Sequence, residues 1–184
     1  MDHRSHRRPC AAAADPANRG QYKDITVIYG ARTPGMLLYK DELAAWEVFE
    51  VGKPWREADA DVAEAIDFLR YYSREMRRLA NPMKLGDRPG EINHRLYSPR
   101  GVATVIAPWN FPLAIPAGMV AAALVTGNAV LFKPSERAPL LGMLLSELLM
   151  SAGVPSDALI CVPGGPEIGH ALVIHPHIVT IAFT

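Results

Sequence analysis

The sequence predicts an α/β fold, a parallel sheet with helices, preceded by a helical segment and a strand pair. From residue 101 onward, short apolar runs alternate with helical patterns, which is typical of consecutive β-α-β units. The apolar runs do not alternate with polar residues, as expected of strands covered on both faces. Polar groups follow two consecutive runs, at 107–112 and 133–136, where open α/β sheets bind ligands.

The composition of the 184-residue chain fits one good domain, or a partial domain with an appendage, and excludes several partners. Hydrophobic residues make up 49%, and 19 basic residues balance 19 acidic ones. A neutral chain offers no electrostatic case for nucleic acid or an acidic membrane. Two distant cysteines, Cys10 and Cys161, are too few for a disulfide framework and favour the cytoplasm. The uncharged stretch 101–132 is interrupted by prolines and is not expected to span a membrane, which needs about 20 apolar residues.

Residues 1–40 are predicted to form a divergent, poorly ordered tail, because they show no sustained period. The run at 25–29 is compatible with a short strand, and Pro34-Gly35 with a turn. The first 20 residues lack the apolar segment of a secretory signal. A mitochondrial presequence is the alternative to a disordered tail, which the aspartates and prolines favour.

Two helices are predicted next. The first covers 41–50 and ends at Gly52-Lys53-Pro54, because glycine caps helices and proline cannot continue them. The second is amphipathic, with apolar residues at three- and four-residue steps from Val62 to Leu79. Asp59 and Asp61 lie near its start, where the helix dipole favours acidic side chains.

The rest of the chain is predicted as strands and helices in alternation. Two strands, at 92–97 and 102–107, are joined by residues 98–101 and form the predicted pair. The later strands and helices connect in parallel, right-handed units. They are predicted as a helix at 113–125, a strand at 129–133, a helix at 139–152, a strand at 158–162, a helix at 166–174 and a strand at 178–183.

Asn110 is the first candidate for chemistry, since a neutral side-chain amide after a strand can donate to a developing oxyanion. The alternative is that Asn110 caps the helix that follows. Lys133 and Glu136, taken alone, are compatible with a solvated turn. A glycine-rich turn at 163–169 can bring backbone N–H groups to a cofactor, although close helix packing explains it equally well.

Ala-Pro-Trp-Asn-Phe-Pro at 107–112, followed by Lys-Pro-Ser-Glu at 133–136, resembles the aldehyde dehydrogenase family. The resemblance covers about 41–184 and implies a Rossmann-like NAD-binding domain. It assigns Asn110 as the catalytic oxyanion donor, and Lys133 and Glu136 to the adenosine ribose hydroxyls. Because a carboxylate there repels a 2′-phosphate, NAD is expected rather than NADP. The full set of expected cofactor-binding residues is Ala107, Pro108, Trp109, Lys133, Ser135, Glu136, Gly165 and Gly169.

Residues 50–72 further resemble the 1-pyrroline-5-carboxylate dehydrogenases, which oxidise L-glutamate γ-semialdehyde to glutamate in proline catabolism. In them a helix glutamate faces the substrate ammonium, and the phenylalanine after the catalytic Asn packs on the substrate; Glu64 and Phe111 match. For Glu64 the alternative is an ordinary exposed helix residue. The resemblance implies a small aldehyde substrate, a homo-oligomeric parent and a cytoplasmic location.

The resemblance divides the chain into a tail at 1–40, a helical segment with the first strand of the pair at 41–100, and a truncated NAD-binding domain at 101–184. The family's catalytic cysteine and glutamate lie beyond the matched residues, and Cys161, in an apolar strand, is expected to be inert. The alternative function is therefore a non-catalytic fragment that binds at most the adenosine part of NAD. A third hypothesis is an unrelated nucleotide-binding module. No metal site is expected, since three histidines near 170–177 fit a helix end and loop.

Overall fold

The computed structural model describes residues 34–184, with side chains from residue 39 onward. The candidate strand at 25–29 and Cys10 lie outside the described residues. From 102 onward, every predicted helix and strand is confirmed to within one residue at each end. The elements, in chain order, are α1 (Pro34–Val51), α2 (Trp55–Leu79), β1 (Met83–Lys84), β2 (His94–Arg95), β3 (Val102–Ile106), α3 (Ala114–Val125), β4 (Ala129–Lys133), α4 (Pro139–Ser151), β5 (Leu159–Cys161), α5 (Pro166–Ile174) and β6 (Ile178–Phe183).

Helix α1 begins at Pro34 rather than at Asp41, so the predicted turn at Pro34-Gly35 was wrong. Proline is tolerated at the first position of a helix, because the N–H that it lacks would have no partner there. The predicted stop after α1 is confirmed, since Gly52 has a φ of +69°, and α2 starts directly after Pro54.

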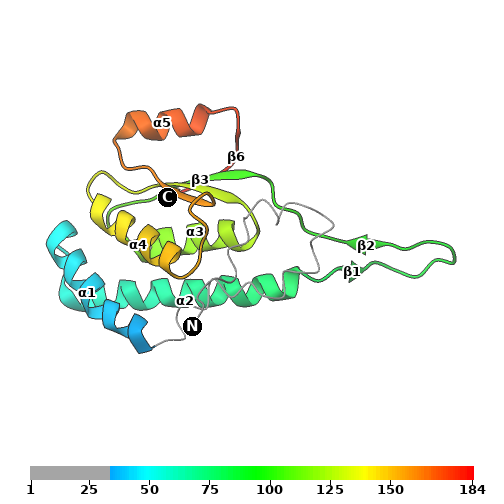
Figure 1. The fold of residues 1–184 in the computed structure, drawn as a ribbon, viewed down its shortest axis with the longest axis horizontal. Helices are drawn as coiled ribbons and strands as arrows, with labels where there is room; N and C mark the ends of the chain where they lie inside the picture. Colours follow the sequence, from blue (N-terminus) through cyan, green and yellow to red (C-terminus); the bar gives the residue numbers. More distant parts are fainter. Residues whose placement is uncertain (1–33) are drawn as a thin grey trace, which may run out of the picture.

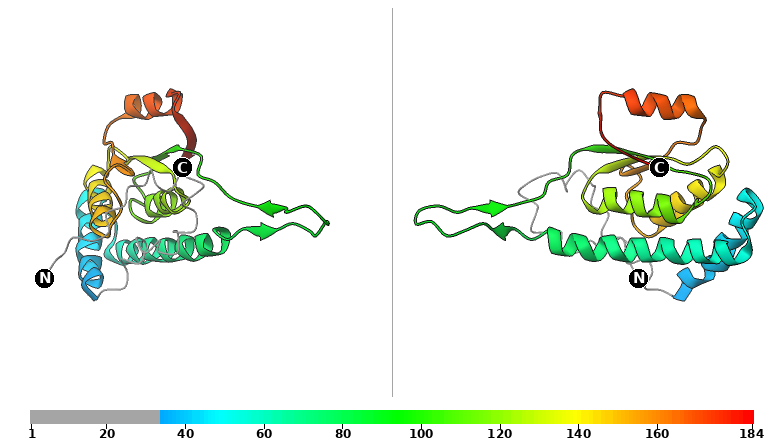
Figure 2. Two further views of the ribbon diagram at one scale, coloured as in Figure 1. Left: turned by 45° about the vertical axis from the view of Figure 1, so that its right-hand side comes forward. Right: turned by 180° about the vertical axis from the view of Figure 1, so that it is seen from behind.

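The strand pair is present, but its members differ from the prediction. Residues 94–95 pair antiparallel with 83–84, not with 102–107. Strand β3 instead lies inside the sheet, between β4 and β6, because its buried apolar side chains need cover on both sides. The β1–β2 ribbon projects away from the body of the molecule (Figures 1 and 2).

The four-stranded sheet is parallel throughout, in the order β5-β4-β3-β6. Helices α3 and α4 lie on one face, with α2 beneath them, and α5 lies on the other face (Figure 1). This arrangement follows from right-handed crossovers, because the chain moves outward from β3 to β5 and then returns to the far side of β3. The carboxyl ends of all four strands therefore meet at one edge of the sheet.

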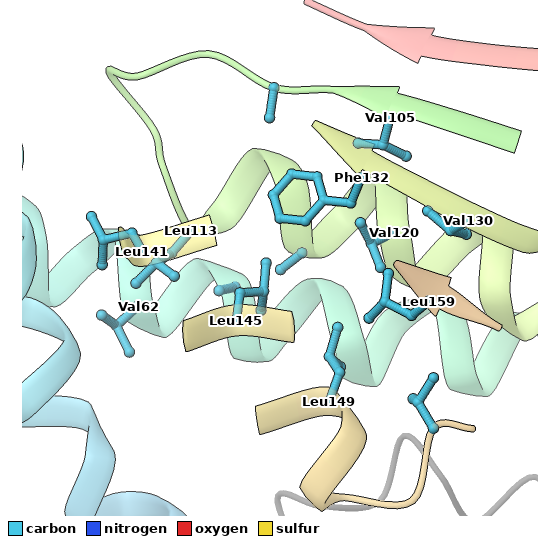
Figure 3. Close-up of a cluster of buried hydrophobic side chains, with 14 of the residues drawn as sticks. Val62, Val105, Leu113, Val120, Val130, Phe132, Leu141, Leu145, Leu149 and Leu159 are labelled. Atoms are coloured by element: carbon cyan, nitrogen blue, oxygen red, sulfur yellow. The ribbon is translucent and has the colours of Figure 1, made fainter. Parts of the chain in front are cut away.

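The core lies between the sheet and helices α3 and α4 (Figure 3). Phe132, Val105 and Val130 point from the strands, and α2 closes the layer with Val62 and neighbouring alanines. The opposite face is less covered: α5 has no buried residue and β6 is largely exposed. The prediction of strands covered on both faces therefore holds for β3 but not for β6. None of the described helices is long and apolar enough to cross a membrane.

Glu50, near the end of α1, connects the outer helices to the sheet layer. Its carboxylate accepts hydrogen bonds from the N–H groups of Leu140 and Leu141, at 2.7 and 2.9 Å, in the first turn of α4. The positive end of a helix dipole favours such a carboxylate. Glu50 thereby fixes the start of α4, the helix that the 133–136 turn leads into.

Candidate functional site

The turns that follow β3 and β4 lie side by side. Ile106 is in register with Lys133, and the N–H of Ala107 donates to the carbonyl oxygen of Lys133 at 3.1 Å. Farther along both turns, the guanidinium of Arg137 lies 5.5 Å from the centre of the Trp109 ring. The two polar segments that the sequence singled out thus share one edge of the sheet, as strand ends in parallel α/β folds do.

Asn110 is exposed in the turn between β3 and α3, flanked by the half-exposed rings of Trp109 and Phe111. It does not cap α3. The N–H groups of Leu113 and Ala114, where that helix starts, donate instead to the carboxylate of Asp61, at 3.4 and 3.2 Å. The capping alternative is therefore wrong, and Asn110 is an exposed residue of this turn that takes no part in starting α3.

Lys133 is buried, with 4% of its surface exposed, so it does not belong to a solvated turn. Its ammonium donates to the carbonyl oxygen of Pro134 at 3.2 Å and lies 3.9 Å from a carboxylate oxygen of Glu136. The Glu136 side chain is 56% exposed and faces outward. The two side chains thus place opposite charges next to each other at the sheet edge, the carboxylate exposed and the ammonium buried.

Ser135 shapes the turn between Lys133 and α4. Its hydroxyl accepts a hydrogen bond from the N–H of Arg137 at 3.2 Å, and its carbonyl accepts one from Ala138 at 3.0 Å. Gly142 supports the turn from α4, because a Cβ there would lie 2.4 Å from the Cβ of Pro134. No sequence pattern pointed to Gly142, since a glycine inside a helix usually indicates only weak helix propensity.

The glycine-rich turn reaches the same place. A Cβ at Gly169 would lie 3.7 Å from Cδ and Cε of Lys133, so the first turns of α5 pass beside the lysine stem. Gly165 precedes α5, and its N–H donates to a carboxylate oxygen of Glu167 at 3.1 Å. The structure thus brings Gly169 to Lys133, whereas Gly165 is occupied by a contact within its own turn.

The two candidate substrate residues are placed differently. Glu64 is exposed on α2, one turn after Asp61. Phe111 is contacted by Lys53, whose ammonium lies 4.3 Å from the centre of the ring. Lys53, which the sequence pattern assigned only to a helix stop, therefore reaches Phe111 from the outer helical segment.

Glu47, Lys53 and Asp61 form a buried ionic cluster. The Lys53 ammonium lies 3.3 Å from a carboxylate oxygen of Glu47 and 3.1 Å from one of Asp61. Burial, and then repulsion from Asp61, raises the pKa of Glu47 to about 8. The prediction that Asp61 serves the start of its own helix was wrong, because its carboxylate is committed to α3 and Lys53. One signal was available: Asp61 is three and four residues from the apolar positions Ala58 and Ala65.

Cys161 is partly buried in β5, and burial raises the pKa of its thiol, against the opposing effect of a hydrogen bond with Ser146. A raised pKa reduces the thiolate fraction on which nucleophilic attack depends. The prediction that Cys161 is a packed rather than a reactive thiol agrees with this position.

The chain is similar to known aldehyde dehydrogenases over most of its length. The model of the aldehyde dehydrogenase family matches residues 35–184, six residues earlier than the motifs alone indicated. The 1-pyrroline-5-carboxylate dehydrogenase of Geobacillus thermodenitrificans is 53% identical over 146 residues, which are 79% of this chain and 28% of that protein. The chain therefore spans less than a third of the length of the curated relative it matches.

Solved structures agree with this result. A variant of Thermus thermophilus 1-pyrroline-5-carboxylate dehydrogenase is 41% identical, with a TM-score of 0.82, over 95% of this chain and 35% of that one. The Thermus enzyme with bound NAD is also 41% identical, with a TM-score of 0.78, over 94% of this chain and 34% of that one. With a family match over most of its length and relatives at about half identity, this chain belongs to the aldehyde dehydrogenase family.

Proposed function

We propose that this chain supplies the adenosine-binding edge and the oxyanion donor of an NAD-dependent dehydrogenase that oxidises L-glutamate γ-semialdehyde to glutamate. The observation that carries the proposal is the hydrogen bond between Ala107 and Lys133, which holds the Asn110 turn beside the Lys133–Glu136 pair. The relatives named 1-pyrroline-5-carboxylate dehydrogenase support the substrate.

The residues at the sheet edge fit the adenosine half of NAD. A buried ammonium beside an exposed carboxylate matches a ribose with two neighbouring hydroxyls, of which one accepts from Lys133 and the other donates to Glu136. The absence of a side chain at Gly169 leaves backbone at the lysine stem, where a nucleotide can approach. NAD bound there would accept the hydride that leaves the aldehyde carbon.

Asn110 acts on the substrate oxygen. When a nucleophile adds to an aldehyde, the carbonyl oxygen gains negative charge, and an N–H donor aimed at that oxygen stabilises the transition state. The Asn110 amide suits this task because it is neutral at every working pH and is not consumed in capping α3. Phe111 and Glu64 are proposed to contact the chain and the ammonium of the substrate.

The experiment is an assay of NADH formation from 1-pyrroline-5-carboxylate with the wild type, Asn110→Ala and the control Asn93→Ala, which alters an exposed ribbon amide. Loss of one oxyanion donor should lower kcat about 100- to 1,000-fold in Asn110→Ala, with unchanged NAD affinity. Equal and measurable rates of NADH formation in all three proteins would contradict the role of Asn110.

A second candidate function is binding of the adenosine half of NAD without turnover. The position of Cys161 favours binding without turnover. Its thiol is partly buried in β5 and has a raised pKa, so little of it is the nucleophilic thiolate. NAD binding without NADH formation in the same assay would support this function, whereas thiol-dependent turnover by the chain would exclude it.

A further inference from the structure

The turn that carries Asn110 packs against the buried cluster of Glu47, Lys53 and Asp61. These three side chains come from the end of α1, the α1–α2 link and α2, and at most 8% of any of them is exposed. Burying three ionisable groups is costly, and replacing such a cluster by apolar residues is often neutral or stabilising. The cluster therefore calls for a role other than stability.

Lys53 contacts the Asn110 turn directly. Its ammonium, which is 3.1 Å from Asp61, also lies 4.3 Å from the centre of the Phe111 ring, within the range of a cation–π interaction. Phe111 follows Asn110 in the chain. A cation held between the Asp61 carboxylate and the Glu47 carboxyl thus restrains the ring next to the oxyanion donor.

Asp61 restrains the other end of the same turn. Its two oxygens accept hydrogen bonds from the N–H groups of Leu113 and Ala114, while one of them also faces Lys53. The turn is therefore fixed at residue 111 through the ring and at residues 113 and 114 through the backbone. Both restraints originate in one cluster, and Asn110 lies just before them.

We propose that Lys53 is a positioning residue for Asn110, which couples the α1–α2 segment to the oxyanion-donating turn. This proposal rests on the function proposed above for Asn110. An oxyanion donor must be held within about 0.5 Å of its productive position, and an exposed side chain on an irregular turn needs such support. Lys53 provides it by sharing its charge between Asp61 and the Phe111 ring.

The test is nuclear magnetic resonance of the whole chain with Lys53→Met, which keeps the length of the side chain and removes its charge. Lys40→Met is the matched control, because it removes the partly exposed Lys40–Asp59 pair between the same two helices. In Lys53→Met, amide hydrogen exchange at Leu113 and Ala114 should be at least about tenfold faster, and the side-chain amide signal of Asn110 should shift. Exchange at Val105 and Val130, in the sheet, should not change.

Lys53→Arg provides the rescue, since guanidinium keeps the charge and stacks on aromatic rings. It should return the Asn110 signal toward its wild-type position. An unchanged Asn110 signal in Lys53→Met, or an equal loss of protection across the sheet, would overturn the proposal. If Lys53→Met does not fold, Phe111→Leu is the second variant. An unchanged Asn110 signal in Phe111→Leu would overturn the proposal. A shifted Asn110 signal, with the amides of Leu113 and Ala114 still protected from hydrogen exchange, would support it.

These readouts need no turnover. A chain without dehydrogenase activity whose Asn110 signal responds to Lys53→Met would count against the proposed function alone. An active chain whose Asn110 signal ignores Lys53→Met would count against the positioning role alone.

Discussion

The N–H of Ala107 donates to the carbonyl oxygen of Lys133 at 3.1 Å, directly after the last paired residues of β3 and β4. This hydrogen bond extends the parallel ladder by one step into the turns. It keeps the segment with Asn110 and the segment with Glu136 at a fixed separation.

Asp61→Asn should lower the free energy of unfolding by about 2–4 kcal/mol, because Lys53 loses a buried partner and the start of α3 loses a charged acceptor. Asp59→Asn is the control, since its pair with Lys40 is partly exposed and should contribute about 1 kcal/mol or less. Urea unfolding of both variants measures the difference. Similar losses in the two variants would show that Asp61 has no special role.

The raised pKa of Glu47 predicts how the free energy of unfolding changes with pH. Burial, and then the charge of Asp61, raises the pKa of its carboxyl from 4.5 to about 8 in the folded chain. Between these values the folded state keeps a proton that the unfolded state has released, so this contribution to stability is full below pH 4.5 and is lost as pH rises to about 8.

Glu47→Gln should remove this decline, because the amide mimics the protonated carboxyl at every pH. Urea unfolding between about pH 5 and pH 8 should therefore show a flatter profile for Glu47→Gln than for the wild type. Glu147→Gln, on the exposed side of α4, should keep the wild-type slope. Parallel profiles for wild type and Glu47→Gln would mean that Glu47 is charged throughout.

Gly142→Ala should destabilise the chain by about 1–3 kcal/mol, since the new Cβ would lie 2.4 Å from Cβ of Pro134 and force the 133–136 turn to move. Gly169→Ala tests the contrast, because its Cβ would meet Lys133 at an ordinary 3.7 Å. That substitution should be neutral or stabilise α5 by up to about 1 kcal/mol. Thermal unfolding of both variants measures the difference. Equal unfolding temperatures for Gly142→Ala and Gly169→Ala would contradict the close packing of Gly142 against Pro134.

Local sequence patterns predicted the sheet and its helices well, and the reason is physical. Strand β4 and helix α5 are bounded by turn and proline signals that act within a few residues, so their predicted bounds agree with the structure. The nearness of Asn110 and Lys133 followed from topology, because consecutive strands of a parallel unit end at the same edge. The pairing of residues 94–95 with 83–84 was missed, since exposed two-residue strands leave almost no pattern.

The contacts beneath the site were not predictable in this way. Asp61 acts on Leu113 and Ala114, which are more than 50 positions away, and the charge of an aspartate near a helix start suggested a local role. Lys53 stood in a Gly-Lys-Pro stop signal, which explains the backbone but not the side chain. A contact between a charged side chain and a residue far along the chain can be recognised only once the tertiary structure shows which residues are buried together.

Lys133 and Glu136 are proposed to bind the adenosine ribose of NAD beside the Asn110 turn. Isothermal titration of the chain with NAD and NADP tests it most directly, using wild type, Glu136→Gln and the exposed control Glu147→Gln. Wild type and Glu147→Gln should prefer NAD, and Glu136→Gln should reduce this preference at least about tenfold, because the 2′-phosphate no longer meets a carboxylate. An NAD-to-NADP ratio that is the same in all three proteins, or no binding of NAD by the wild type, would contradict it.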